Sequence, residues 1–494
     1  MSAQADTSAG TAEPEWVASF QEGAAAFAAG RYDEAARRFQ AAAEAQPDHP
    51  AVLFNLGLAL RGLGRRADAA AAWQHALALR PGHPQTLSQL ASLLAEAGRA
   101  DAAEALYGRL AALDPGFPGA ALGLGNARMA QARPEAAEAA FRLAVAADPA
   151  AHAAVNNLGA ALMAQGRAEE AVALYRRAAR LAPAAPEYHK NLGTALLSLG
   201  RLEEGFREYE WRRRQAVWRW NRDCGGKPAW DGGPPAGRTI LVHYEQGLGD
   251  SFQFVRYLSV LKRLGARTVF ECQPRLKRVL STVPGIDLLV EEGEPVPEFD
   301  CHASLMSLPM LCGTRLDTVP GGVPYLRAEP GLETAWRRRL DPSVFNVGIH
   351  WQANGAERSI PPEHFAALAT LPGVRLHSLQ RGAGLDRPGI VAWGDADRFA
   401  PGDAFADDAA LIAGLDLVVC CDSAVGHLAG AMGRPVFLIL PWLSDWRWMR
   451  ETGETPWYPR TRLFRSPREG GWPAAMAMAA EAVAALAAEK AAKP

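Results

Sequence analysis

Leu415–Leu440 (LDLVVCCDSAVGHLAGAMGRPVFLIL) is the stretch that most directly predicts the fold of the C-terminal half. It begins with a short apolar run, Leu417–Cys421, which is followed by a helix N-cap pair, Asp422-Ser423. Small helix-compatible residues follow over Ala424–Met432. Gly433–Pro435 then ends the helix, and a second apolar run covers Val436–Leu440. The first run has the length of a buried parallel strand. Strand, helix and strand form a βαβ unit, and such folds bind ligands at the carboxyl end of the first strand.

The residues at this turn indicate the kind of ligand that it would bind. Free N–H groups at a helix start suit a phosphate or another anion. A carboxylate at Asp422 would repel a diphosphate, so we expect it to cap the helix or to hold a hydroxyl. The phosphates are then expected near Ser423–Gly426 and near Arg358.

An earlier alternation of strand, loop and helix predicts another Rossmann-like half. Its first strand, Thr239–Tyr244, runs into the glycine-bearing loop Glu245–Asp250, and a helix is expected over Ser251–Leu264. The loop lacks the full G-x-G-x-x-G and a Walker lysine, so it is not a standard dinucleotide or ATP loop. Asp250, at the mouth of the sheet, is suited to take a proton from an acceptor hydroxyl or to cap the following helix, and both roles can hold at once.

The second half contains features whose interpretation stays open. The predicted strand Asn346–His350 leads to a loop in which Arg358 either binds a diphosphate or is a solvated surface charge. The next strand, Val374–Leu379, ends at Gln380. Four tryptophans after Leu440 either stack on a base or sugar ring or form a packed lid: Trp442, Trp446, Trp448 and Trp457. An amphipathic helix over Trp472–Lys490 is expected to pack back across both sheet domains.

The first 212 residues repeat with a period of 34. Glycine recurs at one position of the repeat, and Ala132 takes its place in the fourth unit: Gly30, Gly64, Gly98, Gly166 and Gly200. An alanine recurs at a second position: Ala35, Ala69, Ala103, Ala137 and Ala171. An aromatic residue follows each of these alanines four residues later: Phe39, Trp73, Tyr107, Phe141 and Tyr175. The glycine ends one helix, and the alanine lets its partner helix approach closely. This pattern resembles the tetratricopeptide repeat, with about six units, the last of them degenerate and expected to join the next domain.

The inner face of a tetratricopeptide array is usually a peptide-binding groove. One inner position reads Asn55, Gln89, Gly123, Asn157 and Asn191. The layout resembles that of repeat-bearing O-linked GlcNAc transferases, which use an asparagine ladder there to hold the backbone of an extended protein substrate. The alternative is that asparagine before Leu-Gly is simply common in this repeat.

Composition excludes several classes of protein. The chain of 494 residues is 49% hydrophobic and 21% charged with a net charge of −2, which fits a globular protein and disfavours nucleic-acid binding. The basic and aromatic segment Trp211–Arg222 is therefore expected to pack the last repeat helix against the next domain. Six cysteines without C-x-x-C spacing indicate free thiols in a reducing compartment. Neither a secretory signal nor a membrane-length apolar window is expected, so the prediction is a cytoplasmic protein.

The glycine loop and the D-S-x-x-x-H-L-A-G turn together resemble the GT-B glycosyltransferases, and among them the ADP-heptose:lipopolysaccharide heptosyltransferases of glycosyltransferase family 9. The resemblance implies that Asp250 is the base that activates the acceptor, with Gln246, Gly247 and Gly249 in the same loop. It implies a donor site formed by the second half: Arg358, Gln380, Asp422, Ser423, Ala424, Gly426 and His427. Two residues depart from the family pattern, since Ala424 replaces a glycine and Arg358 a lysine.

These observations predict an all-α repeat superhelix followed by a GT-B fold of two Rossmann-like α/β domains. We expect a disordered start over 1–14, the repeat array over 15–212 and a linker over 213–237. An acceptor domain over 238–335 and a donor domain over 336–494 follow. The GT-B resemblance implies that neither a cofactor nor a metal is needed, and Asp395-Ala396-Asp397 is not taken as a metal-binding D-x-D because it lies in a polar loop and not at a strand end. The predicted partners are a nucleotide-sugar and a protein acceptor such as flagellin. The alternative function is a non-catalytic scaffold with a degenerate nucleotide-sugar domain.

Overall fold

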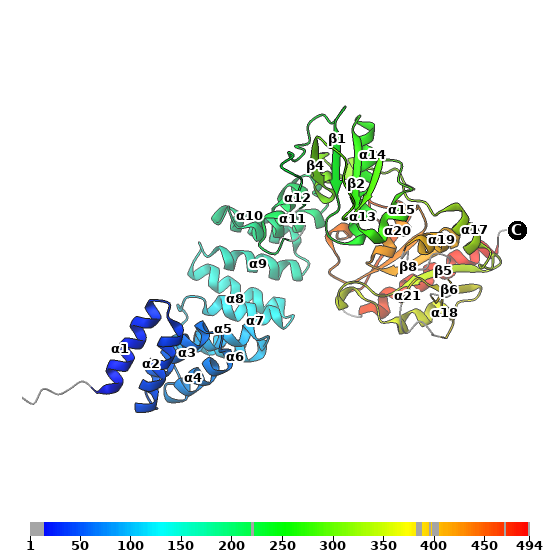
Figure 1. Ribbon diagram of the computed structural model, residues 1–494. Coiled ribbons are helices and arrows are strands. Elements are labelled where there is room, and N and C mark those ends of the chain that lie inside the picture. The colour runs from blue at the N-terminus through cyan, green and yellow to red at the C-terminus, as the bar shows by residue number, and fades with distance from the viewer. Residues whose placement is uncertain are drawn as a thin grey trace, which may run out of the picture. The chain divides into compact units, whose positions relative to one another are not determined.

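The computed structural model describes residues 14–218, 222–381, 388–394, 397, 405–468 and 471–492. It divides into two compact units, Met1–Pro183 and Ala184–Pro494 (Figure 1). Residues 1–13 of the segment expected to be disordered, and Asp395 and Ala396 of the D-x-D sequence, lie outside the described residues. Each unit is described by itself below.

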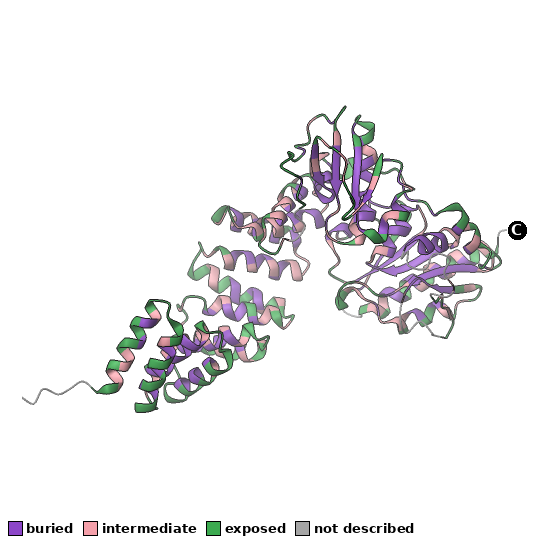
Figure 2. Ribbon diagram, viewed as in Figure 1, coloured by how far each residue is buried: buried purple, intermediate pink, exposed green. Residues whose placement is uncertain are grey.

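The first unit consists of antiparallel helix pairs. Their bounds are α1 Glu15–Ala28, α2 Tyr32–Ala45, α3 Pro50–Gly62, α4 Arg66–Leu79, α5 Pro84–Glu96, α6 Ala100–Leu113, α7 Ala120–Ala130, α8 Pro134–Ala147, α9 His152–Ala164 and α10 Ala168–Leu181. Within each pair the buried residues form a stripe that faces the partner helix (Figure 2). The predicted helical repeat array is thereby confirmed.

A small residue on one helix of most pairs makes room for an aromatic ring on the other. The ring of Trp73 is fully buried, and its Nε1 donates to Phe54 O at 3.1 Å. A Cβ added at Gly57 would lie 2.2 Å from that Nε1. The same relation joins Gly125 to Phe141 and Gly159 to Tyr175. The recurring alanine was predicted to allow this close approach, and these glycines are a second, unpredicted element of the same contact.

The turn between the helices of a pair requires a left-handed residue. Gly30, Gly64, Gly98 and Gly166 have φ between 72° and 85° at this place. Ala132 occupies the equivalent place in the fourth pair with φ of 55°. Left-handed backbone costs a residue with a side chain about 1 to 2 kcal/mol relative to glycine, because Cβ approaches the following carbonyl oxygen. The fourth repeat therefore carries local strain.

The second unit begins with the last helix pair, α11 Pro186–Ser198 and α12 Leu202–Tyr209, and a 3-10 turn, η1 Glu210–Arg214. These helices share one hydrophobic core with the sheets, and the Phe206 ring meets Trp446 edge-on with centroids 5.6 Å apart. The prediction that the sixth repeat is a joint to the following domain is confirmed. The compact unit accordingly starts at Ala184, ahead of the end of the repeat pattern.

The first sheet has four parallel strands in the order β3-β2-β1-β4. The strands are β1 Thr239–His243, β2 Arg267–Cys272, β3 Leu288–Glu291 and β4 Cys301–Ser304. The single helix expected over Ser251–Leu264 is two helices, α13 Leu248–Phe254 and α14 Arg256–Arg263. The first of them begins earlier than predicted, so that Gly249 and Asp250 lie in its first turn.

The second sheet has six parallel strands in the order β10-β9-β8-β5-β6-β7. The strands are β5 Phe345–His350, β6 Val374–Ser378, β7 Ile390–Val391, β8 Leu417–Cys421, β9 Val436–Leu440 and β10 Thr461–Arg465. Helices α19 Ala406–Gly414 and α20 Ala424–Ala431 flank β8 in the sequence. The βαβ unit predicted from Leu415–Leu440 and the α + α/β fold class are confirmed, since the helical array precedes two parallel sheets.

The C-terminal helix α21, Gly471–Ala491, is long and apolar enough to span a membrane by length and composition, which the sequence analysis did not expect of any window. Its stripe of Ala475, Ala479, Val483 and Ala487 is buried in the core that contains β5, β8 and β9. The predicted packing across both sheet domains is wrong, because this core holds only elements of the second sheet domain.

Replacing Ala132 by glycine should stabilise the repeat array by about 1 kcal/mol, because glycine adopts the left-handed turn without strain. Urea unfolding followed by far-UV circular dichroism measures the shift. The control is Ala105→Gly in the exposed middle of α6, which should destabilise by about 1 kcal/mol because glycine is a poorer helix former than alanine. Equal effects of the two changes would contradict the strain at Ala132.

Candidate functional site

A cavity of about 830 Å³ lies between the two sheets of the second unit, at the carboxyl ends of β1, β5 and β8. Ten of the predicted site residues line it: Gln246, Gly247, Gly249, Asp250, Arg358, Gln380, Asp422, Ser423, Ala424 and His427. The two halves of the predicted site, which lie more than 100 residues apart in the sequence, therefore meet at one cavity. Its volume falls in the range of about 300 to 1,000 Å³ that is typical of small-molecule sites.

Gly249 sets how closely the two sheet domains approach. It lies in the first turn of α13, which packs against α20 of the other sheet domain. A Cβ at Gly249 would lie 2.8 Å from Cδ2 of His427, a separation that side chains do not tolerate. The glycine is needed here for this close approach. The loop of the first sheet thus covers the helix start of the second.

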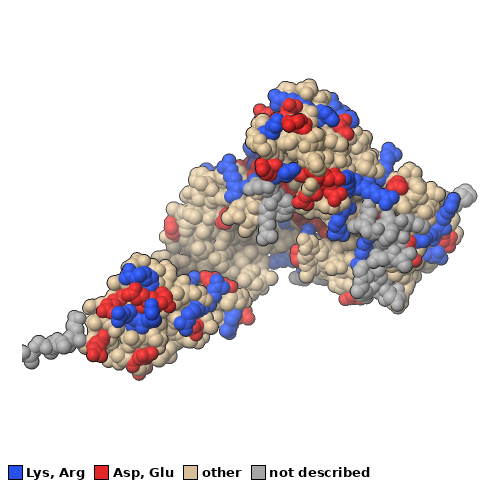
Figure 3. Space-filling view, in the orientation of Figure 1, with Lys and Arg blue, Asp and Glu red and all other residues tan. Residues whose placement is uncertain are grey.

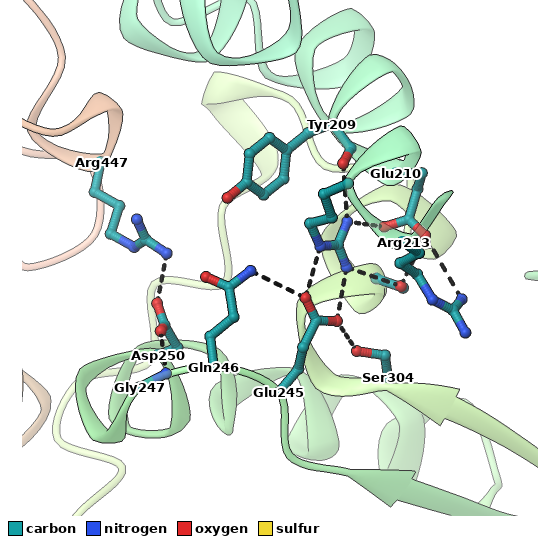
Figure 4. Close-up of polar contacts among 11 residues, drawn as sticks. Tyr209, Glu210, Arg213, Glu245, Gln246, Gly247, Asp250, Ser304 and Arg447 are labelled. Atoms are coloured by element: carbon teal, nitrogen blue, oxygen red, sulfur yellow. Dashed lines mark hydrogen bonds and ion pairs between the residues drawn. The ribbon is translucent and has the colours of Figure 1, made fainter. Parts of the chain in front are cut away.

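Asp250 is bonded through both carboxylate oxygens (Figure 4). Oδ2 accepts a hydrogen bond from the N–H of Gly247 at 2.8 Å, which caps the start of α13. Oδ1 accepts one from Nη2 of Arg447 at 2.5 Å. Burial raises the pKa of Asp250, and the opposing effects of Arg447 and the Gly247 N–H do not cancel it. Asp250 thus caps the helix start from the third helical position and not as the N-cap that was predicted, and the carboxylate also faces the cavity.

Arg447 is the main residue of the site that the sequence did not predict. It lies in a short 3-10 turn, η8 Trp446–Trp448, and joins two carboxylates, since Nη1 donates to Asp445 at 2.8 Å and Nη2 to Asp250. Its pKa is raised by these carboxylates even though burial opposes the charge. The only sequence signal was an arginine within a tryptophan cluster, which we read as aromatic packing or stacking alone.

A second buried ion pair lies beside the glycine loop (Figure 4). Arg212, from η1, donates to both carboxylate oxygens of Glu245 at 2.7 and 2.8 Å, and the side chains are 3% and 0% exposed. Glu245 also accepts a hydrogen bond from Ser304. Burial alone would raise the pKa of Glu245, but Arg212 outweighs it and the net shift is downward. The expected packing of the Trp211–Arg222 segment against the next domain is confirmed by this pair.

The cavity wall formed by the second sheet domain carries an arginine and a carboxylate with a shifted pKa. Arg358 Nη1 lies 3.7 Å from Oδ2 of Asp422, and its side chain is 34% exposed, so it is a half-buried cavity residue rather than a fully solvated loop charge. Burial, followed by the negative charge of Asp445, raises the pKa of Asp422 to about 6. Arg275, which is exposed, and Arg381 also line the cavity, so that four arginines lie on its wall when Arg358 and Arg447 are included.

The helix start at Ser423 differs in detail from the prediction. Ser423 occupies the N-cap position of α20, but its side chain makes no capping hydrogen bond, and its Oγ lies 3.2 Å from Nδ1 of His350. The carboxylate of Asp422 points to Arg358 rather than to the helix backbone. The expected side-chain cap at Asp422-Ser423 is therefore wrong, because both side chains are directed to partners on the neighbouring β5 strand and its following loop.

Two of the predicted donor residues, Gly426 and His427, contribute to packing of α20 more than to the cavity wall. Gly426 does not line the cavity, and a Cβ there would lie 3.1 Å from Sγ of Cys420, so it is a close contact between α20 and β8. His427 lines the cavity, while its Nδ1 lies 2.9 Å from the hydroxyl of Tyr458. Burial, aided by Arg447, lowers the pKa of His427 to about 3, so it is neutral at physiological pH.

Three of the four tryptophans after Leu440 are core residues. Trp446, Trp448 and Trp457 are at most 4% exposed, and only Trp442 is exposed. None of the four lines the cavity among the described residues. The structure thus favours the packed arrangement over stacking on a base or sugar.

The predicted groove residues are all half-buried rather than freely exposed. Asn55 donates to Ala51 O at 2.8 Å, Gln89 accepts from Arg61 at 2.7 Å, and Asn157 donates to Asn126 at 2.8 Å. Asn191 lies in the other compact unit. Gly123 interrupts the ladder because a Cβ there would lie 2.4 Å from the Tyr107 ring.

Comparison with known families supports both parts of the chain. The repeat region matches the tetratricopeptide repeat model in five overlapping segments, residues 20–84, 56–121, 88–152, 122–186 and 156–210. Residues 399–440 match the model of glycosyltransferase family 9 (heptosyltransferase). That match covers β8, α20 and β9, and the turn between β8 and α20 contributes Asp422 and Ser423 to the cavity wall. The resemblances inferred from the sequence are thereby confirmed.

Individual relatives are more distant. Protein FlbA of Caulobacter vibrioides is 28% identical over 288 residues, and the match covers 51% of this chain and 48% of FlbA, so the chain spans about half the length of this relative. MamA 41-end from Desulfovibrio magneticus RS-1 is 22% identical with a TM-score of 0.33, covering 34% of this chain and 97% of that one. A tetratricopeptide repeat protein from Parabacteroides merdae is 18% identical with a TM-score of 0.37, covering 40% and 77%.

Removing one partner of the Arg212–Glu245 pair should destabilise the second unit by about 3 to 5 kcal/mol, because the other charge stays buried without compensation. Arg212→Met is the test, measured by urea unfolding with tryptophan fluorescence. The double variant Arg212→Met/Glu245→Leu should recover most of the loss. Arg207→Met, whose ion pair with Glu203 is at the surface, is the control and should cost less than about 1 kcal/mol. A double variant as unstable as the single one would contradict this account.

Proposed function

We propose that the chain is a glycosyltransferase that moves a sugar from a nucleotide-sugar to an acceptor, and that the acceptor is a protein recruited by the repeat array. The observation that carries the proposal is the meeting of Asp250, from the first sheet, with Arg358 and Ser423, from the second, at one cavity. The family 9 match over residues 399–440 supports the reaction class. In this proposal the enzyme has the GT-B architecture that its two parallel sheets are consistent with.

The proposed chemistry divides between the two walls of the cavity. Asp250 takes the proton of the acceptor hydroxyl, whose oxygen then attacks the anomeric carbon of the donor sugar. The bond from that carbon to the diphosphate breaks, and the nucleoside diphosphate leaves with the bonding electrons. Arg358 and the first N–H groups of α20 stabilise the developing negative charge, so the proposal requires no metal at the donor site.

The raised pKa of Asp250 suits this role, because a base works best when its pKa lies near the working pH. The hydrogen bond from Arg447 holds the carboxylate in position but also competes for its lone pair. In the proposed reaction the acceptor hydroxyl bonds to the face of the carboxylate that the cavity exposes. Arg447 remains hydrogen-bonded to Asp250 and keeps the carboxylate in position between turnovers.

The repeat array supports a protein as the acceptor. Tetratricopeptide arrays bind extended peptides on their inner face, and in this proposal the amides of Asn55, Gln89 and Asn157 exchange their internal hydrogen bonds for bonds to a peptide backbone. A cytoplasmic protein such as flagellin, before its export, is the proposed kind of acceptor. Lys and Arg are interspersed with Asp and Glu over the described residues on the face in Figure 3, which gives no support to nucleic acid as the partner.

One observation favours the alternative of a non-catalytic scaffold that senses a nucleotide-sugar. Both oxygens of Asp250 are already hydrogen-bonded, by Arg447 and Gly247, which is also the arrangement of a purely structural carboxylate. The two functions differ in one measurable respect: a scaffold binds the nucleotide-sugar and the protein partner but transfers nothing between them.

Asp250→Asn should lose transfer by about 10² to 10⁴-fold while it still binds the donor, because the amide keeps the hydrogen bond from Gly247 but cannot accept a proton. A panel of nucleotide-sugars is screened first for binding by calorimetry and for turnover. Transfer is then read as the intact mass of candidate surface and flagellar proteins. Asp317→Asn, on the surface, is the control. Transfer that survives in Asp250→Asn would remove Asp250 as the base, and absence of donor binding or turnover in the wild type would refute the enzyme.

Donor affinity should fall as the pH rises from 5 to 7. Asp422, with a pKa of about 6, is neutral at the lower pH and does not repel the diphosphate, whereas its ionised form does and also pairs with Arg358. The expected decrease is several-fold to about tenfold, measured with a nucleotide-sugar, whose diphosphate does not titrate in this range. Asp422→Asn should bind with nearly constant affinity. A wild-type affinity that does not change with pH would exclude Asp422 from the phosphate site.

A further inference from the structure

Three metal-ligating side chains converge outside the cavity, on the first sheet. Cys224 lies in the turn segment that precedes β1, His243 is the last residue of β1, and His302 lies on the neighbouring strand β4 (Figure 1). Each side chain offers one ligand atom, and these three atoms all lie within 4.8 Å of one another. None of the three residues lines the cavity, so the cluster belongs to no site described above.

The strand register explains why the two histidines face each other. In the parallel pairing of β1 with β4, Leu241 is the partner of His302. His243 lies two residues beyond Leu241 and hence on the same face of the sheet. Their rings have centroids 5.7 Å apart. The fold therefore places two imidazoles side by side under the covering segment.

Backbone pairing brings the cysteine to the same face. The N–H of Trp230 donates to His302 O at 2.7 Å, and the N–H of His302 donates to Pro228 O at 3.1 Å. The segment that carries Cys224 is thereby tied to β4, and Cys224 packs with Leu241 and Val269 on the covered face of the sheet. A loop held by sheet-like hydrogen bonds positions its side chains more firmly than a free linker would.

The histidine nitrogens are unusual for buried polar atoms. Among the described residues, Nε2 of His243 and Nδ1 of His302 are buried and have no hydrogen-bond partner. Buried polar groups are nearly always paired, because burying one without a partner costs free energy. Two such atoms in neighbouring rings, beside a buried thiol, are explained if all three bind a common ligand.

The protonation states fit a cation as that ligand. Burial, together with the charge of His302, lowers the pKa of His243 to about 4, and burial also lowers that of His302. Both imidazoles are therefore neutral at physiological pH, and a neutral imidazole is the form that binds a metal. Burial raises the pKa of the Cys224 thiol, but a bound divalent metal stabilises the thiolate, which releases one proton to solvent.

We propose that Cys224, His243 and His302 form a binding site for a zinc ion. One sulfur and two imidazole nitrogens are ligands typical of zinc, and the fourth tetrahedral position is left to water or to Glu271. Glu271 is buried and is the register partner of His243 on β2, and it is bonded to Arg222 at 2.8 Å. Tetrahedral zinc places its ligand atoms about 3.3 to 3.7 Å apart, so binding draws the three side chains closer together.

The site would be structural. It would fasten the segment between the repeats and the first sheet onto β1 and β4, just before the chain enters the loop Glu245–Asp250. The ligands are widely spaced in the sequence, and no C-x-x-C or H-x-x-x-H motif marks them, which is why the sequence pattern predicted no metal. The inference does not depend on glycosyl transfer, because the ligands lie outside the proposed donor and acceptor sites.

The full-length chain is incubated with zinc and dialysed, and the metal is then measured by mass spectrometry. We expect about one zinc per chain and a higher thermal midpoint than in the chelator-treated protein. Cobalt is titrated into the metal-free chain as a spectroscopic probe, and we expect a thiolate-to-cobalt charge-transfer band with tetrahedral d–d bands. Cobalt binding without a thiolate band, or failure to retain zinc, would overturn the proposal. Both outcomes are measured on the wild-type chain and need no variant.

Variants assign the site to these residues. Cys224→Ala and His302→Ala should each lose the stoichiometric zinc and the stabilisation that it gives, and Cys224→Ala should also lose the thiolate band. The matched control is Cys301→Ala, which removes a buried thiol next to His302 but on the opposite face of β4, in the other hydrophobic core. Equal zinc retention in Cys224→Ala and Cys301→Ala would refute the site, and circular dichroism verifies that each variant is folded.

Discussion

The close packing of α13 against α20 is the constraint on which the candidate site depends. Gly249 allows the first turn of α13 to lie on His427, because any side chain at that position would collide with the ring. This contact places the glycine loop of one sheet over the helix start of the other. The ion pair between Asp250 and Arg447 then joins the same two sheet domains through charge. The cavity forms because two loops from different sheets are held close together. The close contact between Gly249 and His427 sets their distance, and the ion pair between Asp250 and Arg447 adds to it.

A second level of support comes from the last repeat. Arg212 leaves the helical array and pairs with Glu245, which begins the glycine loop, and both side chains are almost completely buried. Such a pair contributes little net stability over an apolar contact, but it strongly penalises any arrangement in which one charge lacks the other. The pair therefore specifies where the loop lies relative to α11 and α12. The last helix pair and the first sheet are thus coupled within one compact unit.

Sequence periodicity predicted the helices, the strands and the order of domains, because these depend on patterns shared by many residues. The donor turn was predictable for the same reason, since the run Leu417–Cys421 and the small residues after it leave few alternatives. Arg447 was not predictable, because its role follows from a contact across 197 residues of sequence. The side-chain cap at Ser423 was predicted from a local preference and is wrong, since His350 on the next strand competes for the same hydroxyl. Local sequence patterns do not encode contacts between segments that are distant in the sequence, so these contacts could not be predicted.

The charges around the cavity are arranged so that carboxylates and cations alternate. Asp445 and Asp250 share Arg447, while Asp422 faces Arg358 across a longer gap of 3.7 Å. Asp445 keeps a low pKa because Arg447 outweighs its burial, whereas Asp422 has no equally close cation and its pKa rises to about 6. These two neighbouring carboxylates thus differ in charge at mildly acidic pH, because only Asp445 has an arginine within hydrogen-bonding distance. An incoming diphosphate would compete with Asp422 for Arg358, and the proton on Asp422 would decide that competition.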